Sequence, residues 1–103
     1  MNNEIKFEER KRIEIVLPIA VSEELIEKLD ALKVFGYTVF PNVLGRGERG
    51  LRSHVGLGSF QYNFLLISCK EEEVDKILRA ARPYLKSFGG VCNISDSKTL
   101  VHW

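Results

Sequence analysis

The N-terminal part of the chain changes from a charged stretch to a regular alternation of hydrophobic and polar residues. Residues 1–11 carry acids and bases with little apolar content, which predicts a flexible N-terminal arm. From residue 12 on, Ile13, Ile15 and Leu17 occupy every second position. Successive side chains of a β-strand point to opposite faces, so this period of two predicts a half-buried strand. Pro18 should end the regular pairing of this strand or place its end at a sheet edge.

A helical period follows this strand. Ser22 is a good N-cap, and Glu23 and Glu24 after it would lie at the positive end of the helix dipole. One apolar face then recurs at three- and four-residue spacing, made of Leu25, Ile26, Leu29 and Leu32. We therefore predict a helix over residues 23–35, with Gly36 as a left-handed C-cap.

A second helix is predicted to begin at the three glutamates of residues 71–73, again at its positive end. Its apolar face consists of Val74, Ile77, Leu78, Ala81 and Leu85. Pro83 should kink this helix or loosen its final turns, because proline cannot donate a backbone hydrogen bond. Gly89 and Gly90 should end it.

Three further stretches read as core strands: residues 37–44, 60–69 and 91–95, with a short terminal segment at 100–103. The order of elements is therefore β-α-β-β-α-β. Right-handed crossovers place both helices on one face of a four-stranded antiparallel sheet, which is the ferredoxin-like plait. The strands are apolar on both sides, yet the second sheet face has no covering element. We therefore expect the chain to assemble through that face, as a small closed ring.

Composition and charge limit the function classes. The chain has 103 residues, 45% of them hydrophobic and 28% charged, which fits one globular domain over residues 12–103. A net charge of +1 gives no overall attraction to nucleic acid or to an acidic membrane surface. No apolar run is long enough for membrane insertion, and no secretion signal is recognisable, so we expect a cytoplasmic protein.

Metal and disulfide chemistry are not indicated. Cys69 and Cys92 are too few for a disulfide framework or a metal knuckle, and we expect buried, reduced thiols. His54 and His102 have no partner at a metal-ligand spacing.

The chemically suggestive stretch begins where strand 37–44 ends. Three glycines and three arginines interleave there: Gly45, Gly47, Gly50 and Arg46, Arg49, Arg52. Glycine adopts backbone angles closed to other residues, so peptide N–H groups can converge on an anion. A guanidinium group can hold a phosphate or carboxylate through two parallel hydrogen bonds. The pattern favours a site for an anionic small molecule such as a nucleotide. The alternative is a solvated hairpin loop whose arginines only keep it soluble.

The plait and its glycine loop resemble a known family. Gly36-Tyr37-Thr38-Val39, followed by Gly45-x-Gly47-x-Arg49-Gly50-x-Arg52-Ser53, is similar to the PII signalling superfamily, nitrogen regulatory protein P-II included. It looks most like the PII-like branch with the regulators of bicarbonate transporters and the carboxysome-associated proteins. The order of elements agrees over residues 12–96. The resemblance implies a homotrimer that binds adenine nucleotides in clefts between neighbouring subunits.

The resemblance also implies roles for individual residues. Thr38 and its neighbours on that strand, Gly36 among the candidates, would lie against the base. The ribose and phosphates would lie near the loop residues Gly45, Gly47, Arg49 and Arg52. Arg46 is a further candidate, although Glu48 can pair with it locally. Gly89 and Gly90 complete the set of ligand-binding candidates.

Two departures from the family pattern bear on the ligand and the target. The family's Gly-Asp-Gly-Lys phosphate-binding turn is missing around residues 87–91, so AMP, ADP, cyclic AMP or a carboxylate-like anion is as plausible an effector as ATP. Residues 45–59 correspond to the family's T-loop, which changes conformation with ligand and contacts a target protein such as a membrane transporter or an enzyme. This loop is short beside that of the nitrogen-sensing proteins and lacks their tyrosine modification site.

Three other functions remain as alternatives. A metal-sensing trimer resembling the CutA proteins would need ligands from Cys69, Cys92, His54 and His102. An acylphosphatase-like enzyme would need Arg49 with Asn42 or Asn93 around a phosphoryl group. No nucleophile–base pair is evident, so we do not expect an enzyme. An RNA-binding plait would need exposed aromatic residues in a basic surround, against which the balanced charge argues.

Overall fold

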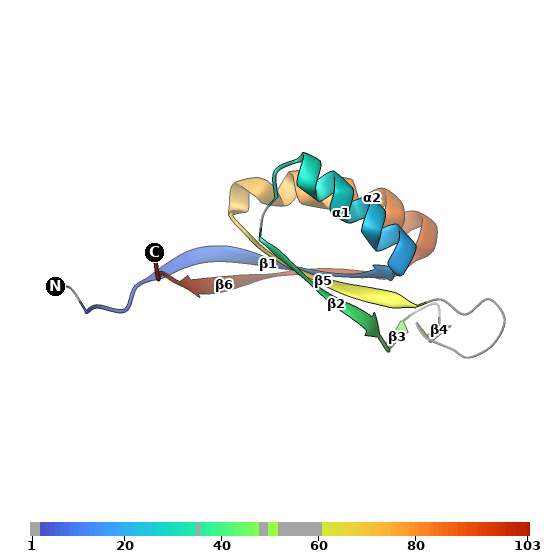
Figure 1. Ribbon diagram of the computed structural model, residues 1–103, viewed down its shortest axis with the longest axis horizontal. Helices are drawn as coiled ribbons and strands as arrows, with labels where there is room; N and C mark the ends of the chain where they lie inside the picture. Colours follow the sequence, from blue (N-terminus) through green and yellow to red (C-terminus); the bar gives the residue numbers. More distant parts are fainter. Residues whose placement is uncertain (1–2, 35, 48–49, 52–60) are drawn as a thin grey trace.

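The computed structural model describes residues 3–34, 36–47, 50–51 and 61–103. The elements along the chain are β1 (Phe7–Pro18), α1 (Ile19–Ala31), β2 (Tyr37–Val43), β3 (Arg46–Gly47), β4 (Gly50–Leu51), β5 (Tyr62–Cys69), the 3-10 helix η1 (Glu71–Glu73), α2 (Val74–Phe88) and β6 (Val91–Leu100). Four strands form an antiparallel sheet in the order β2-β5-β1-β6. Both helices lie on one face of this sheet (Figure 1). This is the ferredoxin-like plait that the sequence predicts, with a small β3–β4 hairpin added.

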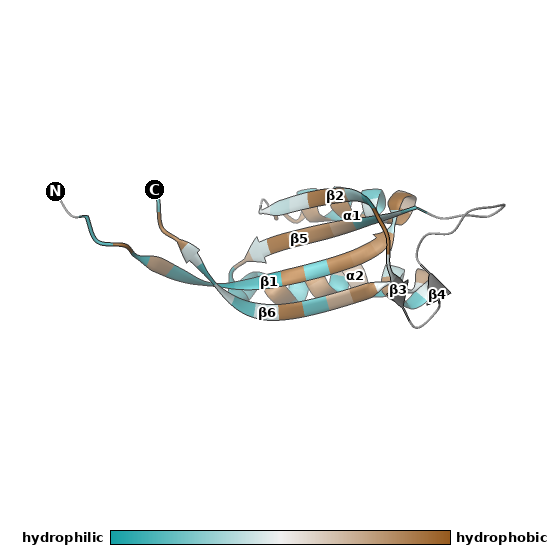
Figure 2. Cartoon of the chain, turned by 90° about the horizontal axis from the view of Figure 1, so that it is seen from below, coloured by the Kyte–Doolittle hydropathy of each residue, from teal (hydrophilic) through white to brown (hydrophobic). Residues whose placement is uncertain are grey.

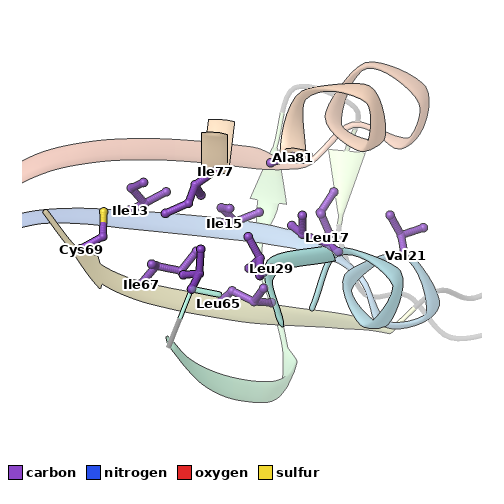
Figure 3. Packing of buried hydrophobic residues seen from close by; sticks show 12 residues of the cluster. Ile13, Ile15, Leu17, Val21, Leu29, Leu65, Ile67, Cys69, Ile77 and Ala81 are labelled. Carbon is purple, nitrogen blue, oxygen red and sulfur yellow. The ribbon is translucent and has the colours of Figure 1, made fainter. Parts of the chain in front are cut away.

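The core lies between the sheet and the helices. Every second side chain of β1 and β5 points to the helices, as the period of two predicts. These side chains pack against the apolar faces of α1 and α2 (Figure 3), and the buried set includes Ile13, Ile15, Leu17, Leu65, Ile67, Leu25, Leu29, Ile77 and Ala81. Cys69 belongs to this core, as expected of a buried thiol.

The first strand is longer than predicted. β1 begins at Phe7, not at residue 12, and its first part pairs with the end of β6, from Phe7 opposite Leu100 to Lys11 opposite Asp96. β5 joins β1 only from Lys11 on, so this part is a two-stranded ribbon that projects from the sheet (Figure 1). Its side chains are largely solvated, and Lys11 forms an ion pair with Asp96 across the strands. Without a buried face the ribbon has no hydrophobic period, so the strand start at residue 12 and the strand end at residue 95 were both wrong.

The first helix begins and ends earlier than predicted. α1 starts directly after Pro18, and Ser22 is a buried residue inside it, where its hydroxyl donates to the carbonyl oxygen of Ile19 at 2.7 Å. The N-cap assignment of Ser22 was therefore wrong. Proline suits this position because the first N–H groups of a helix have no intrahelical partner. The left-handed residue after the helix is Lys33, with φ of 63°, and not Gly36.

The second helix extends past Pro83 to Phe88, so this proline does not end it. Its end is set by Gly89, whose φ is 78° and whose N–H donates to the carbonyl oxygen of Leu85 at 2.9 Å. Gly90 follows with φ of 108°. Two successive residues with positive φ explain why the sequence has glycine twice here.

The sheet face away from the helices, which we call the open face, has neither α1 nor α2 on it (Figure 1). The register places Val16, Phe64 and Phe40 in one row across β1, β5 and β2. The rings of Phe40 and Phe64 meet edge to face, with their centroids 5.7 Å apart. Farther along β1 the face is polar, with an ion pair of 2.9 Å between Arg12 and Glu14. The open face is therefore apolar only toward the end of the sheet where β2 leaves it.

Candidate functional site

The glycine stretch leaves the sheet through an irregularity at the end of β2. The pairing of β2 with β5 is regular up to Phe40 opposite Phe64, and the register shifts before Val43 meets Tyr62. Asn42, inside this bulge, has a positive φ of 54°. Such bulges redirect a strand. Here the chain turns across the end of the sheet toward the β3–β4 hairpin (Figure 2).

The stretch that the sequence predicts as a loop contains this short hairpin. Arg46 pairs with Leu51 and Gly47 with Gly50. Of the loop candidates, the structure describes Gly45 and the backbone of Arg46 and Gly47. Arg49 and Arg52 lie outside the described residues, so their proposed contacts with phosphate stay predictions.

Gly89 and Gly90 lie at the same end of the sheet as the hairpin. A Cβ atom added at Gly90 would lie 2.2 Å from the carbonyl oxygen of Val16. Val16 in turn belongs to the row of Phe64 and Phe40, next to the bulge of β2. Figures 1 and 2 show the end of α2 and the β3–β4 hairpin at this one end. The fold therefore brings Gly45, Gly47, Gly89 and Gly90 into one neighbourhood, which we call the glycine end.

Gly36 and Thr38 are not part of that neighbourhood. The carbonyl oxygen of Gly36 accepts a hydrogen bond of 2.9 Å from the N–H of Ser68, near the opposite end of β5. Thr38 lies opposite Leu66 near the start of the edge strand β2, where it is exposed. Within one chain, the candidate residues therefore fall into two separate groups.

Two of the candidate glycines have a structural reason of their own. A Cβ at Gly36 would lie 2.6 Å from the carbonyl oxygen of Ser68, closer than real Cβ atoms come. The same applies to Gly90 and Val16 at 2.2 Å. Both glycines allow the backbone of a neighbouring strand to approach, whether or not they also contact a ligand.

Sequence reasoning missed Asn63. This side chain lies on the helix-covered face of β5, opposite Leu17, and is only 6% exposed. Its amide nitrogen donates to the hydroxyl of Ser22 at 3.1 Å, and its amide oxygen accepts the N–H of Asn42 at 3.4 Å. One signal was present: Asn63 is a polar residue at a core-facing position of an apolar strand. A buried amide needs partners, and here they are α1 and the bulge of β2.

The dipoles of both helices contribute partial charges at the glycine end. α1 begins there after Pro18, with no acidic residue in its first turn, so its positive dipole end remains uncompensated by a local carboxylate. α2 ends there, and Lys86 in its last turn offsets the negative end of its dipole. The α1 end therefore adds to the attraction that the glycine stretch can exert on an anion.

A pocket of about 500 Å³ lies elsewhere, at the base of the ribbon. Its lining comes from β1, η1 and β6 and is charged throughout: Glu8, Glu9, Arg10, Lys11, Lys70, Glu71, Glu72 and Asp96. None of the predicted ligand-binding residues borders it, and two ion pairs lie in its lining, Arg10 with Glu8 at 2.6 Å and Lys11 with Asp96. The pocket is therefore separate from the glycine end.

The two thiols and the metal alternative can be placed as well. Burial raises the pKa of both the Cys69 and the Cys92 thiol, so both are protonated near neutral pH. The described residues contain no cluster of three or more metal-ligating side chains. His54 lies outside them. Nor does any helix within the described ranges have the length and apolar character to cross a membrane.

The fold and the glycine end define the class, a ferredoxin-like plait with a glycine hairpin between its second and third sheet strands. Comparison with known proteins agrees. The sequence profile of the family described as nitrogen regulatory protein P-II matches residues 10–101. The chain therefore belongs to the P-II family, as the loop motif suggested. No curated protein sequence matches it significantly.

Solved structures give the same result. CPII, a nitrogen regulatory PII-like protein from Thiomonas intermedia K12 bound to ADP, AMP and bicarbonate, is 28% identical with a TM-score of 0.81, over 93% of this chain and 92% of that one. A PII-like signalling protein from Thermus thermophilus has a TM-score of 0.70 at 21% identity, covering 91% and 92%. The B. subtilis GlnK–ATP complex has a TM-score of 0.62 at 20% identity, covering 86% and 82%. The likeness to CPII agrees with the PII-like branch, and the other two show the common fold.

Proposed function

We propose that this chain is a PII-like signalling protein that binds an adenine nucleotide, with ADP or AMP preferred over ATP. The proposal rests mainly on CPII, which is bound to ADP and AMP and is similar over nearly the whole of both chains. The missing lysine turn at residues 87–91 supports the preference for fewer phosphates, because that lysine would have met the terminal phosphate charge. Bicarbonate, also bound to CPII, is a candidate second ligand.

The ligand site lies in clefts between the subunits of a homotrimer. Gly36 and Thr38 lie apart from the glycine end within one chain, so the two groups can contact one ligand only if they come from different chains. The apolar part of the open face supplies a surface for this assembly, since Phe40 is 47% exposed beside Phe64. A closed ring repeats the same contact for every chain and leaves no copy unpaired.

The signal is passed through residues 45–59, which contact a target protein such as a membrane transporter or an enzyme. Membership of the P-II family supports a signalling role. The bulge at Asn42 supports it further, because it turns the chain out of the regular β2–β5 pairing just before this segment begins. A ligand bound at the glycine end would contact the base of the segment and could thereby change what it presents to the target.

Calorimetric titration of the purified protein with AMP, ADP, ATP and cyclic AMP, each with and without bicarbonate, tests the proposal. The molar mass in solution is measured alongside by light scattering. We expect a trimer that binds one ADP or AMP per subunit, with weaker binding of ATP. A trimer that binds none of these nucleotides would overturn the ligand assignment and leave a protein-binding role. A monomer would overturn the intersubunit site.

A further inference from the structure

Asn63 and Ser22 are the two buried polar residues among those that the structure describes, and they contact each other. Two neighbours of Asn63 on the same face of the sheet are buried and apolar: Leu17 opposite on β1 and Leu65 two residues further along β5. A leucine would suit this position. Burying an amide instead is unfavourable unless its hydrogen bonds are made, so the structure should show what the amide holds.

The amide holds three segments together. Asn63 donates to the hydroxyl of Ser22 at 3.1 Å, and that hydroxyl donates to the carbonyl oxygen of Ile19 at 2.7 Å, in the first turn of α1. On its other side the amide oxygen of Asn63 accepts the backbone N–H of Asn42 at 3.4 Å. No buried side-chain nitrogen or oxygen in the described residues lacks a partner. The chain of hydrogen bonds therefore connects the start of α1, the start of β5 and the bulge of β2.

The bulge needs such a connection. Pro41 has no N–H for the sheet, and the register of β2 on β5 shifts at this point. The N–H of Asn42 is thus left without a carbonyl across the ladder, and the side chain of Asn63 accepts it. The positive φ of 54° at Asn42 costs free energy for a residue with a Cβ, although asparagine tolerates it better than most. A side-chain acceptor that fixes the N–H of Asn42 stabilises this conformation.

We propose that Asn63 is a positioning residue for the ligand site at the glycine end. By holding Asn42 in its bulge, it sets the direction in which the chain enters Gly45 and the β3–β4 hairpin, and hence where the N–H groups of Gly45 and Gly47 lie relative to Gly89. Asn63 itself is too deeply buried to touch the ligand. The choice of ADP as ligand rests on the proposed function, whereas the control of the hairpin by Asn63 does not.

The variant Asn63→Leu tests this directly, because leucine has the same branching at Cγ as asparagine and makes neither hydrogen bond. Two quantities are measured: the dissociation constant for ADP by calorimetry, and amide exchange and chemical shifts at residues 42–47 by NMR. We expect ADP to bind about fivefold more weakly or worse, the loss that corresponds to one hydrogen bond. We also expect faster exchange at Asn42 and shifted signals at Gly45 and Gly47.

A second variant separates positioning from general destabilisation. Ile77 is fully buried against the sheet, remote from the bulge along the sequence, and Ile77→Val loses one buried methyl group without touching the hydrogen-bond chain. This variant should lower the unfolding midpoint and leave ADP affinity and the signals of residues 42–47 unchanged. An equal loss of ADP affinity in Asn63→Leu and Ile77→Val would overturn the positioning role.

The remaining outcomes are also decisive. Unchanged ADP affinity in a folded Asn63→Leu overturns the proposal. If Asn63→Leu does not fold, Asn63→Ala takes its place, because alanine removes both hydrogen bonds of the amide without adding volume. Unchanged ADP affinity and unchanged Gly45 and Gly47 signals in Asn63→Ala would equally refute it. If the wild-type protein binds no adenine nucleotide, the proposed function fails, and the NMR signals of Gly45 and Gly47 alone decide whether Asn63 sets the hairpin.

Discussion

Replacing Gly90 by alanine should destabilise the protein strongly, because two independent features of the structure exclude a side chain there. The backbone has φ of 108°, which side-chain-bearing residues rarely adopt. An added Cβ would also lie 2.2 Å from the carbonyl oxygen of Val16 and 3.3 Å from Cδ2 of Leu17. The first of these neighbours is backbone in the centre of the sheet, where Val16 is paired with Phe64 on one side and Val91 on the other. The clash therefore cannot be relieved by turning a side chain.

The size of the effect follows from the two terms. A positive φ costs a residue with a Cβ roughly 1–2 kcal/mol. Displacing packed neighbours to make room for an added carbon costs roughly 1–3 kcal/mol. We therefore expect Gly90→Ala to lower the free energy of unfolding by roughly 2–5 kcal/mol. For a domain of this size each kcal/mol corresponds to about 4–8 °C in the thermal midpoint, so the midpoint should fall by at least about 8 °C.

Thermal unfolding followed by circular dichroism measures this midpoint. Equal protomer concentrations are needed, since assembly makes the midpoint concentration-dependent. Ser87→Ala is the matched control, because Ser87 is exposed on the last turn of α2 and should change stability by less than about 0.5 kcal/mol. If Gly90→Ala unfolded at the same temperature as the wild type, the close approach of Gly90 to β1 would be wrong. The placement of the glycine end beside β1 would then fail with it.

Four further outcomes are expected. Arg49→Ala should weaken ADP binding by roughly 1–3 kcal/mol in calorimetry and leave the thermal midpoint unchanged. The control is Arg79→Ala, at an exposed position, and a loss of assembly in Arg49→Ala would instead mark Arg49 as an interface residue. Phe64→Asp should convert the proposed trimer to monomers, because it adds a charge beside Phe40 on the open face. Light scattering measures the molar mass, and an intact trimer would exclude this face as the interface. Ile77→Ala should lower the free energy of unfolding in urea by about 2–5 kcal/mol, and a loss below about 1 kcal/mol would contradict its burial. Cys92, whose thiol pKa is raised by burial, should react with iodoacetamide only at higher pH than a free thiol, and the difference should vanish in denaturant.

The fold could be predicted because the core imposes its period on the sequence. Ile13, Ile15 and Leu17 alternate because one face of β1 packs on the helices, and Leu25 and Leu29 are four residues apart because one stripe of α1 packs on the sheet. Wherever burial is one-sided, the pattern of hydrophobic residues reports it. The order of elements and the helix-covered face followed from these patterns alone.

The errors fall where burial gives no such pattern. No side chain in the ribbon of β1 and β6 is buried, so its residues can carry charges and its pairing leaves no hydrophobic period in the sequence. Ser22 resembles an N-cap in type but is buried inside α1, because Pro18 already begins the helix and Asn63 supplies the partner for the hydroxyl. Gly36 resembles a C-cap, yet its role is to let the chain approach Ser68. Serine and glycine each occur in several structural roles, and the prediction assigned Ser22 and Gly36 the commonest role of their residue type.

For the candidate site, sequence reasoning could name residues but not their arrangement. Gly47 in the hairpin and Gly89 after α2 are more than forty positions apart in the sequence. Only the antiparallel register of the strands places them at the same end of the sheet. That register depends on the bulge at Asn42, which no local motif announces. Asn63, which accepts its N–H, is a single polar residue in an apolar strand and could be recognised as unusual but not assigned a partner.

The position of β2 in the sheet also bears on how the chains assemble. Gly36 and Thr38 lie toward one end of β2 and the hairpin follows the other, so β2 connects two parts of the candidate site that cannot meet within its own chain. A rigid strand keeps them apart by a fixed distance, and a ligand that needs both must lie between two copies. Assembly and ligand binding are then thermodynamically linked, because the ligand contacts two chains at once. The ligand stabilises the association of the chains, and association strengthens ligand binding by the same free energy. An adenine nucleotide should therefore raise the thermal midpoint of the assembled protein, but should do nothing for the Phe64→Asp monomer, where each chain offers only half of the site.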